Sequence, residues 1–127
     1  MTVTGAGTNS ASLGLGTVSM YGGTVPAKMT RTINGADISF NLSTPIDIRV
    51  DLSNSPSTTY TLSAMLGTAD IVNVWTLGPT DISSGASFAL ASAGIYGTAV
   101  PYTLKLTVPA GENGAISNTI AFLVVAN

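Results

Sequence analysis

Apolar and polar residues alternate with a period of two along most of the chain after residue 28. The alternation is clearest in residues 46–52, where isoleucine, valine and leucine are separated by Asp47, Arg49 and Asp51. Such a pattern is typical of a strand with one buried face and one face in solvent. It predicts strands over residues 29–33, 38–42, 46–52, 60–66 and 102–108, and a returning strand over residues 116–125. The side chains predicted to face the core are Ile38, Phe40, Leu42, Ile46, Ile48, Val50, Leu52, Tyr60, Leu62, Ala64, Leu66, Phe88, Leu90, Tyr102, Leu104, Leu106 and Val108.

Glycine and proline positions divide these strands. We expect Asn34-Gly35 to form a two-residue hairpin turn, and Thr44-Pro45 to end one strand before the next begins. Residues 70–77 are apolar on both faces, which predicts a central strand with Trp75 in the core. Residues 91–98 contain two glycines and are predicted to form a loop.

The pattern as a whole indicates an all-β fold. Glycine or proline interrupts nearly every window of helical length, and β-branched residues dominate the rest. Roughly seven to nine short strands at about ten-residue spacing predict a single β-sandwich, immunoglobulin-like or jelly-roll. Residues 1–26 are rich in Gly, Ala, Ser and Thr and are predicted to form an N-terminal arm or edge strand. The sandwich domain is expected over residues 27–127.

Charge is scarce in this chain. Only 8% of the residues are charged and the net charge is −2, whereas about 25% of an ordinary soluble domain is charged. The basic patch that binds nucleic acid is missing, so we expect no nucleic-acid partner. Burying Ser, Thr and Gly at a contact costs less than burying Lys or Glu, so an uncharged surface favours a protein covered by neighbours. The alternative is a monomer from an organism that favours small polar residues.

Candidate chemistry is limited by composition. The sequence contains neither histidine nor cysteine, which excludes Ser-His-Asp triads, Cys-His dyads and zinc sites of the usual kind. Asp47 and Asp51 would lie about 13 Å apart on one strand face, with Arg49 between them, which is too far for a glycosidase pair. Asp70 and Asp81 lie at predicted loop edges but lack the spacing of a calcium loop. We therefore expect no enzymatic activity, no cofactor and no metal.

Neither a membrane span nor a leader is expected. No apolar run approaches the ~20 residues that a transmembrane helix needs, so we expect no membrane partner. Residues 1–5 carry no basic region and no apolar run, and so do not look like a signal peptide. The protein is then either assembled without secretion or has lost a leader.

Several apolar and aromatic side chains are candidates for assembly contacts, including Tyr60, which the alternation would also allow to face the core. Ala11, Leu13 and Leu15 alternate with small residues and could pair as a strand with a neighbour. Tyrosines near strand ends and in loops are expected at the surface. The complete set of interface candidates is Leu13, Leu15, Val18, Tyr21, Tyr60 and Tyr96.

In length, low charge, β-pattern and arm, the whole chain resembles the small decoration or cement proteins of tailed-bacteriophage capsids. The resemblance implies a non-enzymatic virion protein on the capsid surface, with residues 1–26 as an arm that reaches a neighbour. It also implies two kinds of partner: copies of itself, with a trimer suited to symmetric capsid sites, and a major capsid protein or other scaffold protein.

Two alternatives stay open. Residues 102–111 and 119–124 resemble the last two strands of bacterial immunoglobulin-like and pilin-type domains, and residues 11–15 resemble the extension of subunits assembled by donor-strand exchange. A pilus or adhesin subunit would be extracellular, at the cell surface, and would have a sandwich lacking one strand. No leader is visible, however, and the chain holds enough strands to close its own sandwich. A carbohydrate-binding module, the third possibility, would need coplanar exposed aromatic rings, which Tyr21, Tyr60 and Tyr96 only weakly allow.

Overall fold

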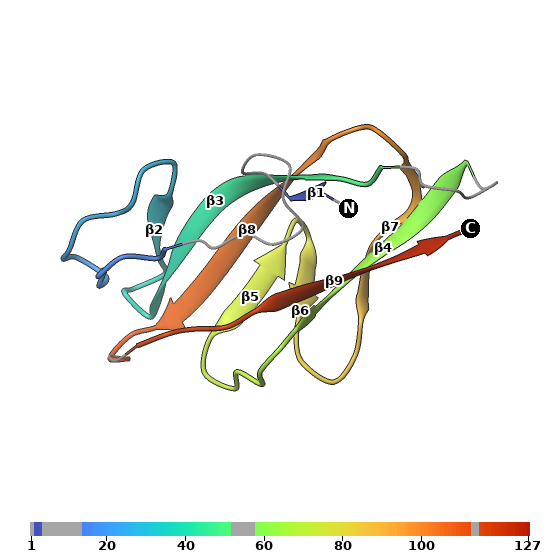
Figure 1. The fold of residues 1–127 in the computed structure, drawn as a ribbon. Coiled ribbons are helices and arrows are strands. Elements are labelled where there is room, and N and C mark those ends of the chain that lie inside the picture. The colour runs from blue at the N-terminus through green and yellow to red at the C-terminus, as the bar shows by residue number, and fades with distance from the viewer. Residues whose placement is uncertain (1, 4–13, 52–57, 113–114) are drawn as a thin grey trace.

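The computed structural model describes residues 2–3, 14–51, 58–112 and 115–127, and within them the chain forms strands and turns without a helix (Figure 1). The strands are β1 (Thr2–Val3), β2 (Thr30–Asn34), β3 (Ser39–Arg49), β4 (Thr59–Leu66), β5 (Val74–Leu77), β6 (Thr80–Ile82), β7 (Phe88–Ile95), β8 (Val100–Pro109) and β9 (Ile120–Ala126). The prediction of an all-β fold with seven to nine strands is confirmed.

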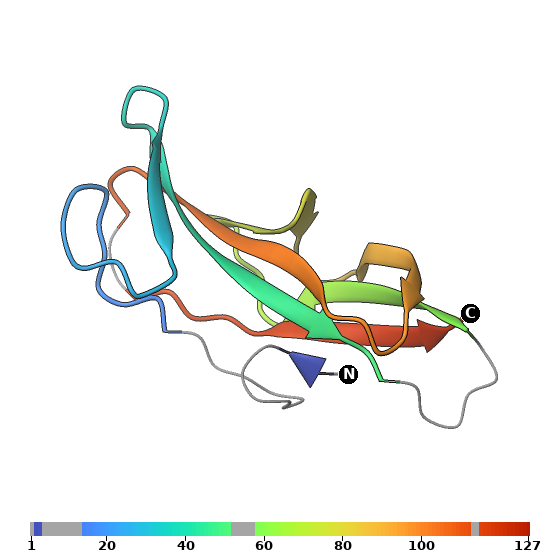
Figure 2. The same cartoon turned by 90° about the horizontal axis from the view of Figure 1, so that it is seen from above.

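The strands form two antiparallel sheets that pack face to face as a β-sandwich. The larger sheet has the order β1-β3-β8-β5-β6, with β2 also paired to β3, and the smaller sheet has the order β7-β4-β9. After β3 the chain passes to the opposite sheet at every connection except the β5–β6 hairpin. Figure 2 shows the two layers diverging toward the end that carries β2.

The core lies between the sheets and follows the alternation in the sequence. In β4 the inward side chains, Tyr60 to Leu66 at every second position, are at most 2% exposed. From the larger sheet, Ile48 and Leu77 are fully buried, and Trp75 is 6% exposed. The predicted inward faces of β3, β4 and β8 are therefore correct along most of their length.

Several predicted strand boundaries are wrong. The returning strand predicted over residues 116–125 begins only at Ile120. β3 runs unbroken through Pro45. This residue lies between the part of β3 paired with β2 and the part paired with β1, and of the described strands only β8 pairs with it there. A sheet tolerates a missing amide proton best at such a position. Part of the predicted loop over residues 91–98 belongs to β7, which extends to Ile95. The central strand predicted over residues 70–77 begins only at Val74.

The turn after β2 also differs from its prediction. Asn34 pairs with Ser39, so the hairpin loop has four residues, 35–38, instead of two. Gly35 and Asp37 adopt positive φ angles of 54° and 59°, which places this loop outside the two-residue geometry. Ile38 belongs to the loop and is 66% exposed, so its predicted place in the core is wrong. The predicted core residue Leu52 lies outside the described residues.

The described part of the predicted arm lies against the sandwich. Leu15, Val18 and Met20 pack against the core from the end where the layers diverge. A bridge between Val18 and Gly23 closes a small loop, and the Arg31 guanidinium donates hydrogen bonds to the carbonyls of Ser19 and Gly22. Residues 14–25 thus partly fill the opening between the layers.

Candidate assembly surface

Charged residues are absent from the whole smaller sheet. The sequence has four basic and six acidic residues, and none of them lies in β4, β7 or β9. They lie in the larger sheet and in loops: Lys28, Arg31, Asp37, Asp47, Arg49, Asp51, Asp70, Asp81, Lys105 and Glu112. One layer of the sandwich is therefore uncharged on both of its faces.

The outer face of this sheet carries apolar side chains among small and hydroxyl residues. The β4–β9 register sets Leu123 beside Ser63 and Val125 beside Thr61, and Ile95 of β7 lies opposite Thr59 on the same face. Leu123, Val125 and Ile95 are 53%, 51% and 57% exposed. We call this surface the uncharged face; its side chains are Thr59, Thr61, Ser63, Met65, Ala89, Ile95, Ala121, Leu123 and Val125. A sheet face in solvent is usually polar and charged, so this one is suited to being covered.

The two edges of the smaller sheet differ. β9 pairs with β4 residue by residue from Ile120 to Ala126, with no bulge, and in the described part of the chain no strand pairs with its other side. At the opposite edge, β7 has register shifts against β4 and contains Gly94. Bulges, Lys and Pro are the features by which natural sheets protect their edges, and β9 has none of them.

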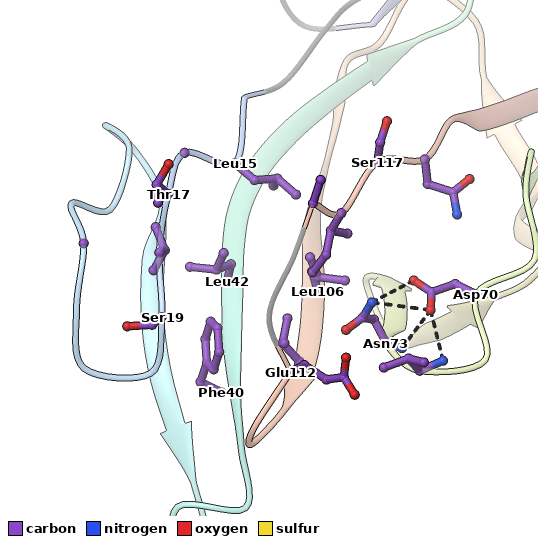
Figure 3. Close-up of a pocket in the computed structure, with 18 of the residues that line it drawn as sticks. Leu15, Thr17, Ser19, Phe40, Leu42, Asp70, Asn73, Leu106, Glu112 and Ser117 are labelled. Carbon is purple, nitrogen blue, oxygen red and sulfur yellow. Dashed lines mark hydrogen bonds between the residues drawn. The ribbon is translucent and has the colours of Figure 1, made fainter.

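A groove of about 900 Å³ opens where the two layers diverge (Figure 3). Its floor is the inner face of β3 and β8, formed by Phe40, Leu42, Leu106 and Val108. Its walls come from loops: residues 15–19, 68–73 and 115–118. At this end the larger sheet is therefore covered by loops instead of a strand.

Asp70 organises one wall of the groove. Its carboxylate accepts hydrogen bonds from the amides of Val72 and Asn73, from the Asn73 side chain, and from the Trp75 indole at 2.8 Å. Partial burial raises the pKa of this carboxyl, but the hydrogen bonds lower it by more, to about 2. A carboxylate surrounded by donors holds a turn in place, so this geometry gives Asp70 a structural role.

The Asp70 turn predicts a loss of stability in acid. Because folding lowers this pKa from 3.8 to about 2, the contribution to stability is complete above about pH 5 and is lost as pH falls toward 2. Allowing for solvent screening, we expect the ionised Asp70 carboxylate to contribute about 1 to 2 kcal/mol to the free energy of unfolding. Urea unfolding should show Asp70→Asn less stable than the wild-type protein at pH 6. The difference between their free energies of unfolding should become smaller at pH 4 and smaller still at pH 2.5. A constant gap between the two proteins would contradict this assignment.

The other acidic residues do not converge on a site. Arg49 forms an ion pair with Asp51 at 3.0 Å, and Asp81 accepts a hydrogen bond from Thr76. Within the described ranges, no group of three or more acidic, histidine or cysteine side chains is arranged to hold a metal ion. No helix in the same ranges is long and apolar enough to cross a membrane.

The structure places the interface residues predicted from sequence in different environments. Leu15 and Val18 line the groove, and Tyr21 is 67% exposed, with its hydroxyl donating to Asp37. Tyr96 is half-buried beside the Tyr60 ring, with centroids 5.1 Å apart. The prediction that Tyr60 lies at the surface is wrong: it is 1% exposed, because its position in β4 points inward. Leu13 lies outside the described residues.

Sequence reasoning missed the exposed residues of the smaller sheet. Leu123, Val125 and Ile95 do not appear among the predicted interface residues, although all three are about half exposed. A signal was present in residues 120–126, an uninterrupted apolar run in which the alternation with polar residues fails. Such a run predicts a strand that is apolar on both faces, and therefore one whose outer face needs a cover.

The described chain is an antiparallel β-sandwich with an uncharged outer face, a regular unpaired edge strand and an open groove. Comparison with known proteins finds no match to it among protein-family models, curated proteins or solved structures.

Proposed function

We propose that this protein is a non-enzymatic structural subunit that works by packing into a larger assembly. The uncharged face carries the proposal. Covering it removes about half-exposed Leu123, Val125 and Ile95 from water without desolvating a charge. An isolated soluble domain would keep charge on such a sheet for solubility.

For the assembly itself, we propose the head of a tailed bacteriophage, with the protein as a capsid decoration or cement protein. A small all-β chain with 8% charged residues suits this role, since decoration proteins stabilise a head by buried area and not by chemistry. The partners would be further copies of this chain and a major capsid protein, and the location would be the virion surface.

The groove favours a second candidate, a pilus or adhesin subunit assembled by donor-strand exchange. Phe40, Leu42, Leu106 and Val108 form a strip of inner sheet face that loops cover where a strand could lie. A strand donated by a neighbouring subunit would complete the smaller layer at that place and pair with existing backbone. This candidate would place the protein at the cell surface.

Immunogold electron microscopy separates the two candidates. Antibodies against the purified protein would be applied to virus particles and to cells from the culture that produces it, with a gene-deletion strain as control. Regular labelling of phage heads is the expected result. Labelling of surface filaments would replace the capsid proposal with the pilus candidate. Recovery of the protein only as a soluble monomer, with no labelled particle or filament, would contradict both.

A further inference from the structure

We propose that two copies of this chain pair edge to edge through β9 about a two-fold axis. The two smaller sheets would then form one continuous six-stranded sheet with the uncharged faces on one side. This inference rests on the proposed role as an assembling subunit, and it names the partner and the contact.

The backbone of β9 is the first argument. β9 has 7 residues, about 24 Å of extended chain, all in register with β4. The other outer strands of the described sheets are short or protected: β1 has 2 residues, β6 has 3 residues with Asp81 in the middle, and β2 carries Arg31. β7 is interrupted by its register shifts. Of the described outer strands, β9 is thus the one that offers a long, regular and unprotected edge.

Incomplete burial of the core at this edge is the second argument. Phe122 and Val124 of β9 point inward but stay half-buried, whereas their neighbours Leu62 and Ala64 on β4 are each 1% exposed. The chain closes the opposite side of the sandwich by passing from β6 directly to β7. A strand added beside β9 would cover the flanks of Phe122 and Val124.

Charge identifies the occupant as a second copy. Neither β9 nor the strand beside it contains a charged residue, so two identical edges can meet with no like charges opposite one another. A partner strand that carried charge would find no counter-ion here. Antiparallel pairing of a strand with its own copy follows from two-fold symmetry, the commonest symmetry of soluble oligomers.

The symmetry also limits the register. The uncharged faces fall on one side of the joined sheet only if outward residues meet outward residues. The two-fold axis must therefore lie midway between one β9 residue and the same residue of the second copy. One position of β9 therefore lies directly opposite its own copy, with Cα atoms about 4.5 to 5.5 Å apart. That separation is within the range of a disulfide.

A cysteine scan tests the contact, because the chain has no cysteine of its own. Ala121, Phe122, Leu123, Val124 and Val125 would each be replaced by Cys in turn, with Val74→Cys on the outer face of the larger sheet as control. Val74 is 46% exposed, close to the 51% of Val125. Non-reducing gels under mild oxidation should show one β9 position forming dimer at least tenfold faster than Val74→Cys. Equal rates at all positions would overturn the proposal.

Sedimentation tests the same dimer without relying on disulfide formation. One strand edge covers less than a standard interface, so we expect a dimer with a dissociation constant in roughly the micromolar range or weaker. In sedimentation at high concentration, Val125→Lys should weaken the dimer at least tenfold and Val74→Lys should not. A trimer unaffected by Val125→Lys would overturn β9 pairing and leave the structural role intact. Failed immunogold labelling would instead remove that role.

Discussion

Replacing Ile48 with aspartate is expected to unfold the domain. Ile48 is fully buried and lies in a cluster with Val50, Tyr60 and Leu62. An unpaired carboxylate in this position would cost several kcal/mol, which is comparable to the whole stability of a typical small domain. Far-UV circular dichroism and urea titration of Ile48→Asp should show no cooperative unfolding transition.

Two variants on the same strand region serve as controls. Ile48→Val keeps the site apolar and should cost about 0.5 to 1.5 kcal/mol. Asp51→Ala removes only the exposed partner of Arg49 and should change stability by about 0.5 kcal/mol or less. A cooperatively folded Ile48→Asp protein would mean that the inward face of β3 is wrongly assigned.

The parts of the fold that the sequence predicted well are those in which alternation is strict. Apolar residues occupy every second position from Tyr60 to Leu66, and the structure buries each of them, although the outward Met65 is also apolar. Ile38 continues the sequence alternation of the strand that follows it, but it lies in the turn between β2 and β3 and is exposed. Positive φ angles at Gly35 and Asp37 lengthen this turn so that it includes Ile38. Local pattern cannot distinguish the end of a strand from the start of a turn when the turn residue is itself apolar.

The candidate surface depended on information that is not local. That residues 120–126 form an apolar strand is visible in the sequence. The sequence does not show that this strand lies at a sheet edge, because its position depends on pairing with β4, which ends more than fifty residues earlier. The uncharged face arises only when β4, β7 and β9 are brought together, although each strand lacks charge in its own right.

Gly94→Ala is expected to be the most damaging single-methyl addition in the described strands. Gly94 pairs with Tyr60, and a Cβ atom built at Gly94 would lie 2.2 Å from the Cζ atom of the Tyr60 ring. That ring cannot swing away, because it is 1% exposed and packs against Tyr96. Overpacking of this kind should cost about 3 kcal/mol in the free energy of unfolding, measured by urea titration.

Two comparisons make the Gly94 result specific. Gly14→Ala adds the same methyl where no atom lies within 4 Å, and it should be nearly neutral. Tyr60→Leu removes the end of the ring, so adding Gly94→Ala to it should cost much less than Gly94→Ala costs in the wild-type protein. We expect the double-mutant cycle to give a coupling of about 1 to 3 kcal/mol. Additive effects would mean that the Tyr60 ring does not cover Gly94, and the close contact between β4 and β7 would need another explanation.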